Sequence, residues 1–175
     1  MGAKHPYKSA GRHSTGDFVA QPLRQNHALP IYVLNGPNLN LLGSREPELY
    51  GSATLKDIEQ AVEAKARAMG RAVVFRQSNR EGELIDWVQE ARHGAIGVIL
   101  NAGGYSHTSV ALLDACRALD RPLVEVHLSN PYKREAFRRH SYVSEAAGGV
   151  ICGLGTFGYV LAVDALSELI KARPE

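Results

Sequence analysis

Five short runs rich in apolar residues recur along the chain, and segments with helical spacing lie between most of them. The runs cover residues 31–34, 72–75, 96–100, 123–127 and 149–154. Runs this continuous are typical of strands that are covered on both faces. Strands that alternate with helices favour parallel β-α-β units with right-handed crossovers. The sequence therefore predicts an α/β protein, a three-layer α/β/α sandwich around a five-stranded parallel sheet of order 2-1-3-4-5.

The best-defined helix follows the first run and its polar loop. Thr54 fits a helix N-cap with Asp57 three residues on, the spacing of a capping box, and Gly70 ends the apolar repeat. Three further helices are expected, over residues 81–92, from Thr108 onward and over residues 159–172. In this flavodoxin-like arrangement the loops after strands one, three and four meet at the switch point between strands one and three, where ligands bind. We therefore expect the functional residues in those three loops.

The first 29 residues differ in composition from the rest of the chain. They carry four basic residues against one acid, Asp17, and show no apolar period. This composition favours a flexible basic arm. It is weakly similar to an organelle transit peptide, and an expression remnant or a misplaced start codon fits it at least as well. The length of the chain then predicts a single domain over residues 30–175.

Charge and cysteine usage argue against several classes of protein. The formal net charge of +2 provides no clustered positive face for nucleic acid. Two cysteines, Cys116 and Cys152, make neither a disulfide framework nor a metal-binding spacing. No run approaches the roughly 18 apolar residues of a membrane span, and the first residues lack a signal-peptide core. We expect a cytoplasmic protein that binds neither nucleic acid nor membrane and holds no metal.

The loop after the first run, residues 35–51, is rich in polar residues and turn formers. Asn38 lies just past the carboxyl end of the predicted strand, and two glycines bracket a segment with Arg45 and Tyr50, as hinges bracket a lid. A phenol near pKa 10 is protonated at neutral pH, but an opposite charge nearby lowers such a pKa by about one to three units. Arg45 beside Tyr50 would therefore make a tyrosinate base. A solvated surface loop with a packed tyrosine is the alternative, and it is the commoner one.

The fourth run places two titratable residues on one face. Glu125 and His127 alternate along the predicted strand, so their side chains point the same way. A carboxylate that accepts a hydrogen bond from one ring nitrogen fixes the tautomer of the imidazole and raises its basicity, as a general acid requires. A strand-end histidine that is hydrogen-bonded only for stability is an equally good interpretation.

Residues after the third and fourth runs suit an anionic ligand. Asn101 is followed by Gly103-Gly104 and His107, and a glycine turn before a helix can cradle an anion, although a plain tight turn is the alternative. Ser129 is another candidate for a carboxylate. There is no Gly-x-Ser-x-Gly elbow, no carboxylate pair suited to glycoside cleavage and no histidine pair at metal-binding spacing. The combination suits proton removal beside a carbonyl, with loss of a hydroxyl, on a small anionic substrate.

Five motifs occur in order along the chain: LNGPNLNLLGSREPELYG, RQSNREGELIDW, ILNAGGYSHTSVALLDA, VEVHLSN and REAFRRHSY. Together they closely resemble the type II 3-dehydroquinate dehydratases of the shikimate pathway, which supplies chorismate and the aromatic amino acids. The resemblance spans about residues 31–169. It implies a flavodoxin-like subunit in a homododecamer, a tetramer of trimers. It also implies anti elimination of water from 3-dehydroquinate through an enolate to give 3-dehydroshikimate, without metal or cofactor.

The resemblance also implies roles for individual residues. Tyr50 matches the proton acceptor, Arg45 the arginine that supports the tyrosinate, and His127 the proton donor with Glu125 behind it. Asn38 matches a residue that positions a water near the enolate oxygen. Positions that hold the carboxylate and hydroxyls of the substrate match Asn101, His107, Leu128, Ser129 and Arg138. Asp114 matches an acid that reaches into the site of a neighbouring subunit across the trimer interface.

One segment departs from the commoner family pattern, which has a small residue or histidine at the positions of Pro131 and Tyr132. The departure leaves open how Arg134 and Arg138 are aimed. Two functions of other classes stay open beside the enzyme. One is a non-catalytic sensor of quinate-like ligands, and the other is a flavodoxin-like nucleotide or flavin binder, which the lack of a hydroxyl-rich phosphate loop disfavours.

Overall fold

The computed structural model describes residues 29–44 and 52–173 of the chain. Two predictions fall outside these residues. One is the flexible arm, apart from its last residue, and the other is the lid segment with Arg45 and Tyr50. Among the described helices, none is long and apolar enough to cross a membrane.

A five-stranded parallel sheet of order β2-β1-β3-β4-β5 forms the middle layer. Its register pairs Ile31 with both Val73 and Gly97, so the first, second and third strands begin at one level. The fold class and the strand order are as predicted from the sequence. The strands are β1 Ile31–Asn35, β2 Val73–Gln77, β3 Gly97–Asn101, β4 Leu123–His127 and β5 Gly149–Cys152.

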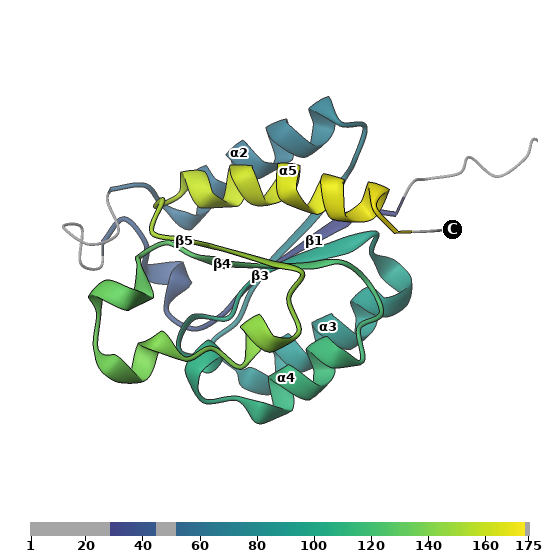
Figure 1. Cartoon of the computed structure of the whole chain (residues 1–175). Helices are drawn as coiled ribbons and strands as arrows, with labels where there is room; N and C mark the ends of the chain where they lie inside the picture. Colours follow the sequence, from purple (N-terminus) through teal and green to yellow (C-terminus); the bar gives the residue numbers. More distant parts are fainter. Residues whose placement is uncertain (1–28, 45–51, 174–175) are drawn as a thin grey trace, which may run out of the picture.

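Two helices cover each face of the sheet (Figure 1). On one face lie α2 Leu55–Ala68 and α5 Phe157–Lys171, and on the other lie α3 Glu81–Gly94 and α4 Val110–Arg117. Side chains that alternate along β1 divide between the two layers of core. Val33 packs in the cluster with α2 and α5, and Leu34 packs in the cluster with α3 and α4.

Short 3-10 turns form much of the rest of the connections. They are η1 Leu39–Leu41, η2 Gly103–His107, η3 Pro131–Lys133, η4 Ala136–Arg139 and η5 Val143–Glu145. The last three belong to the long connection between β4 and β5, which in Figure 1 is the green segment beside the carboxyl ends of the strands. None of these turns was predicted, because three to five residues are too few to show a periodicity.

Side-chain caps mark the starts of α2 and α4. At α2 the Thr54 hydroxyl accepts from the Asp57 backbone, and the Asp57 carboxylate accepts from the Thr54 backbone, which is the predicted capping box. The prediction that a helix opens at Thr108 is wrong. The turn η2 occupies the residues before Thr108, and Ser109 caps α4 by accepting from the backbone N–H of Leu112 at 2.8 Å.

Several other boundaries differ from the predictions by one or two residues, as at the ends of β1, β2, β3 and α3. The last strand ends at Cys152 rather than at residue 154, because Gly153 adopts φ 81°, outside the extended region. The last helix begins at Phe157, two residues early, and its fully buried residues are Tyr159, Ala162, Val163 and Leu166.

Candidate active site

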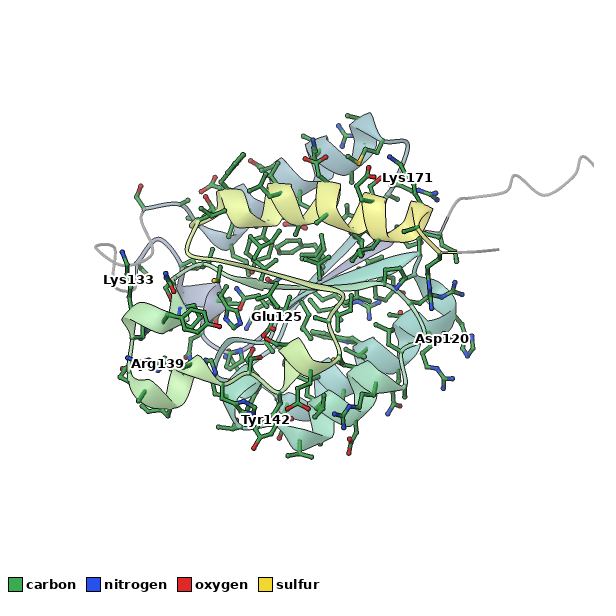
Figure 2. The ribbon with its side chains drawn as sticks, in the orientation of Figure 1. Asp120, Glu125, Lys133, Arg139, Tyr142 and Lys171 are labelled. Carbon is green, nitrogen blue, oxygen red and sulfur yellow. The ribbon has the colours of Figure 1, made fainter. Side chains whose placement is uncertain are left out.

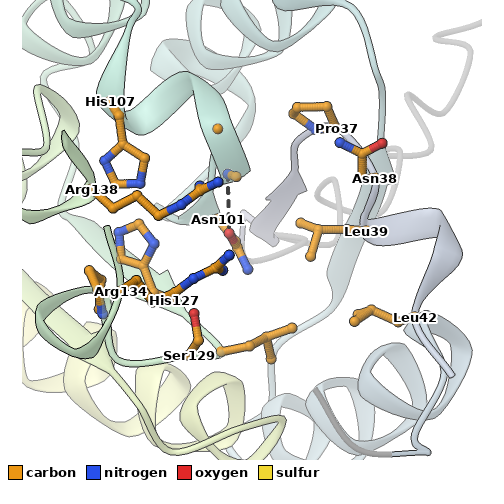
Figure 3. A pocket seen from close by; sticks show the side chains of 14 residues that line it. Pro37, Asn38, Leu39, Leu42, Asn101, His107, His127, Ser129, Arg134 and Arg138 are labelled. Atoms are coloured by element: carbon orange, nitrogen blue, oxygen red, sulfur yellow. Dashed lines mark hydrogen bonds between the residues drawn. The ribbon is translucent and has the colours of Figure 1, made fainter. Parts of the chain in front are cut away.

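A pocket opens at the carboxyl ends of β1, β3 and β4, where the topology places a switch point. Figure 3 shows His107, His127, Arg134 and Arg138 on one side of it and Pro37, Asn38, Leu39 and Leu42 on the other. Its lining residues are Pro37, Asn38, Leu39, Leu42, Asn101, Gly103, Gly104, His107, His127, Leu128, Ser129, Pro131, Arg134 and Arg138. The pocket therefore combines an apolar wall with a cationic one.

Backbone atoms of two neighbouring loops form the floor of the pocket. The N–H of Gly36 donates to the carbonyl of Asn101 at 2.8 Å. A Cβ at Gly36 would lie 2.3 Å from the carbonyl oxygen of Ala102, so only glycine allows this approach. On the next turn Gly103 has φ 58° and donates its N–H to Oδ1 of Asn101 at 3.2 Å. The ends of β1 and β3 are thus joined at this point mainly through main-chain atoms.

A buried polar network supports this floor from below. The phenol of Tyr159 donates to Oδ1 of Asn35 at 2.6 Å and accepts from Nδ2 of Asn101 at 2.9 Å. Asn35 in turn donates to the carbonyl of Arg76 at 3.0 Å. Tyr159 is fully buried, and that burial raises the pKa of its phenol well above the usual range, so the hydroxyl keeps its proton. The network fixes which way the Asn101 amide faces.

The first loop holds Asn38 in a left-handed conformation, with φ 68°. Asparagine tolerates this region better than most residues. The backbone N–H of Asn38 donates to Oδ1 of Asn79 at 2.9 Å, and the carbonyl of Asn79 accepts from the Tyr105 hydroxyl at 2.8 Å. The loop after β2 therefore ties the first loop to η2.

His127 and Glu125 form a hydrogen-bonded pair at the end of β4. Oε1 of Glu125 lies 2.8 Å from Nε2 of His127, and Glu125 is fully buried. Oε1 also accepts from Ser141 at 2.6 Å, and Oε2 accepts from Ser144. Burial alone would raise the pKa of Glu125. The hydrogen bond from His127 and the charge of its ring lower the pKa most, and the hydrogen bonds from Ser141 and Ser144 lower it further. Together they outweigh burial and hold the pKa of Glu125 below its usual value.

His107 stacks beside His127, with ring centroids 5.9 Å apart and planes 15° from parallel. Its Nδ1 lies 2.7 Å from the backbone carbonyl of His140, which accepts only, so Nδ1 carries the proton. Partial burial lowers the pKa of His107, and the nearby His127 and Arg138 lower it further. His107 is therefore neutral near pH 7, and its Nε2 is a hydrogen-bond acceptor.

Both arginines of the β4–β5 connection line the pocket, despite the Pro131-Tyr132 departure. Oδ1 of Asn130 accepts from the Tyr132 backbone at 3.0 Å, so Asn130 and Pro131 start a short turn that brings Arg134 to the wall. Glu135 pairs with both guanidinium groups, at 3.5 Å to Arg134 and 2.9 Å to Arg138. The arrangement suits an anionic group of a ligand.

The structure brings together seven of the predicted site residues at the pocket wall and places Glu125 behind them. The seven are Asn38, Asn101, His107, His127, Leu128, Ser129 and Arg138. Asp114 lies apart, exposed on α4 and outside the pocket lining. Arg45 and Tyr50 lie outside the described residues.

Sequence reasoning missed four supporting residues, Asn79, Ser141, Ser144 and Tyr159. Ser141 and Asn79 stand inside motifs quoted above, but each works through a contact distant in the sequence. For Tyr159 the sequence predicts only the start of a helix. A tyrosine on the inward face of a helix was the available signal, because a buried phenol needs a partner.

Chemically, the wall offers a neutral imidazole, a second imidazole backed by a buried carboxylate, and two guanidinium groups. These can donate a proton to a leaving group and bind an anion. Within residues 29–44 and 52–173, no group of three or more His, Cys, Asp or Glu side chains is placed to hold a metal ion.

Comparison with known proteins identifies the family. Residues 29–167 match the family described as Dehydroquinase class II. The chain is 60% identical over 142 residues to the 3-dehydroquinate dehydratase of Phenylobacterium zucineum, covering 81% of this chain and 98% of that one. It is 58% identical over 143 residues to the 3-dehydroquinate dehydratase of Caulobacter vibrioides, covering 82% and 98%.

Solved structures agree. The type II dehydroquinase of Butyrivibrio crossotus superposes with a TM-score of 0.78 at 38% identity, covering 80% of this chain and 98% of that one. The type II dehydroquinase of Propionibacterium acnes superposes with a TM-score of 0.76 at 40% identity, covering 84% and 99%. With its fold, its motifs and its match over most of its length, the chain belongs to the class II dehydroquinase family.

Proposed function

We propose that this protein is a 3-dehydroquinate dehydratase that removes water from 3-dehydroquinate to give 3-dehydroshikimate in the shikimate pathway. The observation that carries the proposal is the His127–Glu125 pair, at 2.8 Å, in the wall of a pocket that also holds two arginines. The high identity to relatives of that name over nearly their whole length supports the same substrate.

The proposed reaction is an anti elimination in two steps. The tyrosinate of Tyr50, supported by Arg45, takes a proton from the carbon beside the ketone, and the electron pair moves to the carbonyl oxygen to form an enolate. The enolate then expels the hydroxyl, which leaves as water with a proton from His127. Asn38 positions a water near the enolate oxygen, and Glu125 orients the ring of His127 through the hydrogen bond to Nε2.

The arginine side chain of Arg138 in the pocket wall and the amide of Asn101 in the floor each bind part of the substrate. Arg138, from the connection between β4 and β5, pairs with substrate oxygens, as a guanidinium fork does with a carboxylate. Ser129 and the backbone at Leu128 offer hydrogen bonds at the end of β4. Asn101 is held rigidly by Tyr159, and Nε2 of His107 accepts from a substrate hydroxyl.

The quaternary structure and the cellular place of the enzyme belong to the same proposal. Asp114, exposed on α4, completes the site of a neighbouring subunit within a homododecamer built as a tetramer of trimers. Light scattering tests the assembly, and a fully active monomer would remove Asp114 from the site. We place the enzyme in the cytoplasm, where its pathway substrate would be met.

A direct assay tests the activity. The product is a conjugated enone, so incubation with 3-dehydroquinate should produce an ultraviolet absorbance that grows with time and with enzyme concentration. Tight binding of the substrate without growth of absorbance would instead indicate the sensor, and a yellow purified protein would indicate the flavin binder.

A further inference from the structure

Three hydrogen-bond donors converge on the buried carboxylate of Glu125. Besides Nε2 of His127, they are the hydroxyls of Ser141 and Ser144, which lie 16 and 19 positions further along the chain. Figure 2 shows Glu125 inside the molecule. Lys133 and Arg139, which belong to the same β4–β5 connection as Ser141 and Ser144, lie at the periphery. A segment that is otherwise largely exposed thus sends two hydroxyls inward to one carboxylate.

The direction of these hydrogen bonds follows from their partners. The backbone N–H of Ser144 donates to Oγ of Ser141 at 3.3 Å, and an N–H can only donate. Ser141 therefore accepts on one side and turns its own proton toward Oε1 of Glu125. An ionised carboxylate accepts only, so all three donors are satisfied when Glu125 is charged. Protonation of Glu125 would remove an acceptor site from one of them.

We propose that Ser141 and Ser144 are positioning residues for the reaction, because they keep the Glu125 carboxylate charged and aimed at Nε2 of His127. Because Nε2 of His127 is hydrogen-bonded to Glu125, Nδ1 of His127 is the atom that exchanges a proton with the substrate. Without the two hydroxyls the carboxylate becomes the better base, and the proton of His127 is shared with a buried oxygen that no ligand reaches. The inference rests on the proton-donor role given to His127 above.

Other charged or titratable groups face this pair and stay constant when the serines are changed. From η2 comes His107, whose ring stacks on His127, and from the β4–β5 connection come Arg134 and Arg138 in the same wall. From α4 comes Cys116, and burial raises the pKa of this thiol to about 12, so it is neutral. A change in the titration of the pair on loss of a hydroxyl is therefore assignable to that hydroxyl.

Ser141→Ala and Ser144→Ala test the proposal by steady-state kinetics across pH. We expect kcat to fall about tenfold or more in each, since a hydrogen bond to a charged group is lost, and KM to change less than about twofold. The alkaline limb of the kcat profile should move upward by about one pH unit, because a carboxylate with fewer donors holds its proton to higher pH. A merely structural role would lower kcat without moving the limb.

A second readout does not depend on turnover. Nitrogen NMR of labelled histidine, with His127 assigned through His127→Gln, follows the ring against pH in the free protein. The His127–Glu125 pair should titrate at higher pH in both alanine variants. A wild-type protein without activity would contradict the proposed function. The NMR titration of the variants tests the role of the two serines separately.

Two control variants complete the design. Ser141→Thr keeps the hydroxyl and should restore both kcat and the position of the limb. Tyr32→Phe removes another hydroxyl that donates to a carboxylate, that of Glu90 at 2.7 Å, outside the pocket lining, and should leave the profile unchanged. The proposal is overturned if the folded alanine variants keep wild-type kcat and titration. It is equally overturned if kcat falls with no shift, or if Ser141→Thr fails to rescue.

Discussion

The rings of His107 and His127 lie nearly parallel with their centroids 5.9 Å apart, so two imidazolium charges would repel each other across the stack. The two histidines have different partners. Nε2 of His127 is hydrogen-bonded to the carboxylate of Glu125, and Nδ1 of His107 to a backbone carbonyl. The lowered pKa of His107 leaves its Nε2 free to accept from a ligand hydroxyl, while the carboxylate of Glu125 holds the ring of His127 in place.

The lowered pKa of His107 predicts how stability responds to acid. Below the ordinary histidine pKa of about 6.5, the unfolded chain takes up a proton at this position before the folded protein does. The free energy of unfolding should therefore fall with pH from about 6.5 downward, and His107→Gln should flatten that fall. Denaturant titrations at several pH values and one protein concentration measure it. An equal fall in wild type and variant would contradict the assignment.

Replacement of His127 by alanine should remove the proton donor. We expect kcat to drop by about 10²–10⁴-fold with a small change in KM, since a positioned acid contributes in the transition state. The enone absorbance assay measures both constants. His93→Ala, an exposed histidine on α3, is the matched control and should keep wild-type kinetics. A His127→Ala enzyme with unchanged kcat would show that another group donates the proton.

Tyr50→Phe should abolish turnover, because phenylalanine cannot take the proton beside the ketone. The loss of one hydroxyl should leave the fold and most of the affinity for product intact. Calorimetric titration with 3-dehydroshikimate, together with the absorbance assay, separates binding from chemistry. Retention of the wild-type rate would remove Tyr50 from the mechanism.

Tyr159→Phe should weaken both the fold and the pocket floor. It leaves Oδ1 of Asn35 and Nδ2 of Asn101 without their shared partner in a buried place, which costs about 1–3 kcal/mol of unfolding free energy. The freed Asn101 amide should raise KM several-fold. Tyr105→Phe removes a hydroxyl from a more exposed bond and should cost less than half as much. Denaturant titration compares the two, and equal losses would argue against the network.

The sheet order could be predicted from the sequence because it follows from local patterns: apolar runs, helical spacing and the handedness of crossovers. β4 was predicted at its observed bounds, Leu123–His127, since Pro122 precedes it and a polar loop follows. The start of α4 was not, because Thr108 and Ser109 are equally good caps in sequence. Only the preceding turn η2, a tertiary feature, decides that Ser109 does the capping.

The site residues likewise include some that a local sequence pattern places together and others that only the tertiary fold brings together. Glu125 and His127 are two positions apart on one strand, so the period of the strand already places them together. Ser141 reaches Glu125 by folding of the long β4–β5 connection, and Tyr159 reaches Asn35 across 124 positions. Such contacts depend on how layers pack, and single-sequence patterns carry no information on that.

The contact between Gly36 and Ala102 has a consequence for how this protein can change over time. The two loops approach each other here through main-chain atoms, so the side chains on the rim of the cavity take no part in this approach. Residues on the rim of the cavity can therefore be substituted one at a time during evolution. Such substitutions can change which ligand binds, while the pocket floor that carries Asn101 keeps its shape.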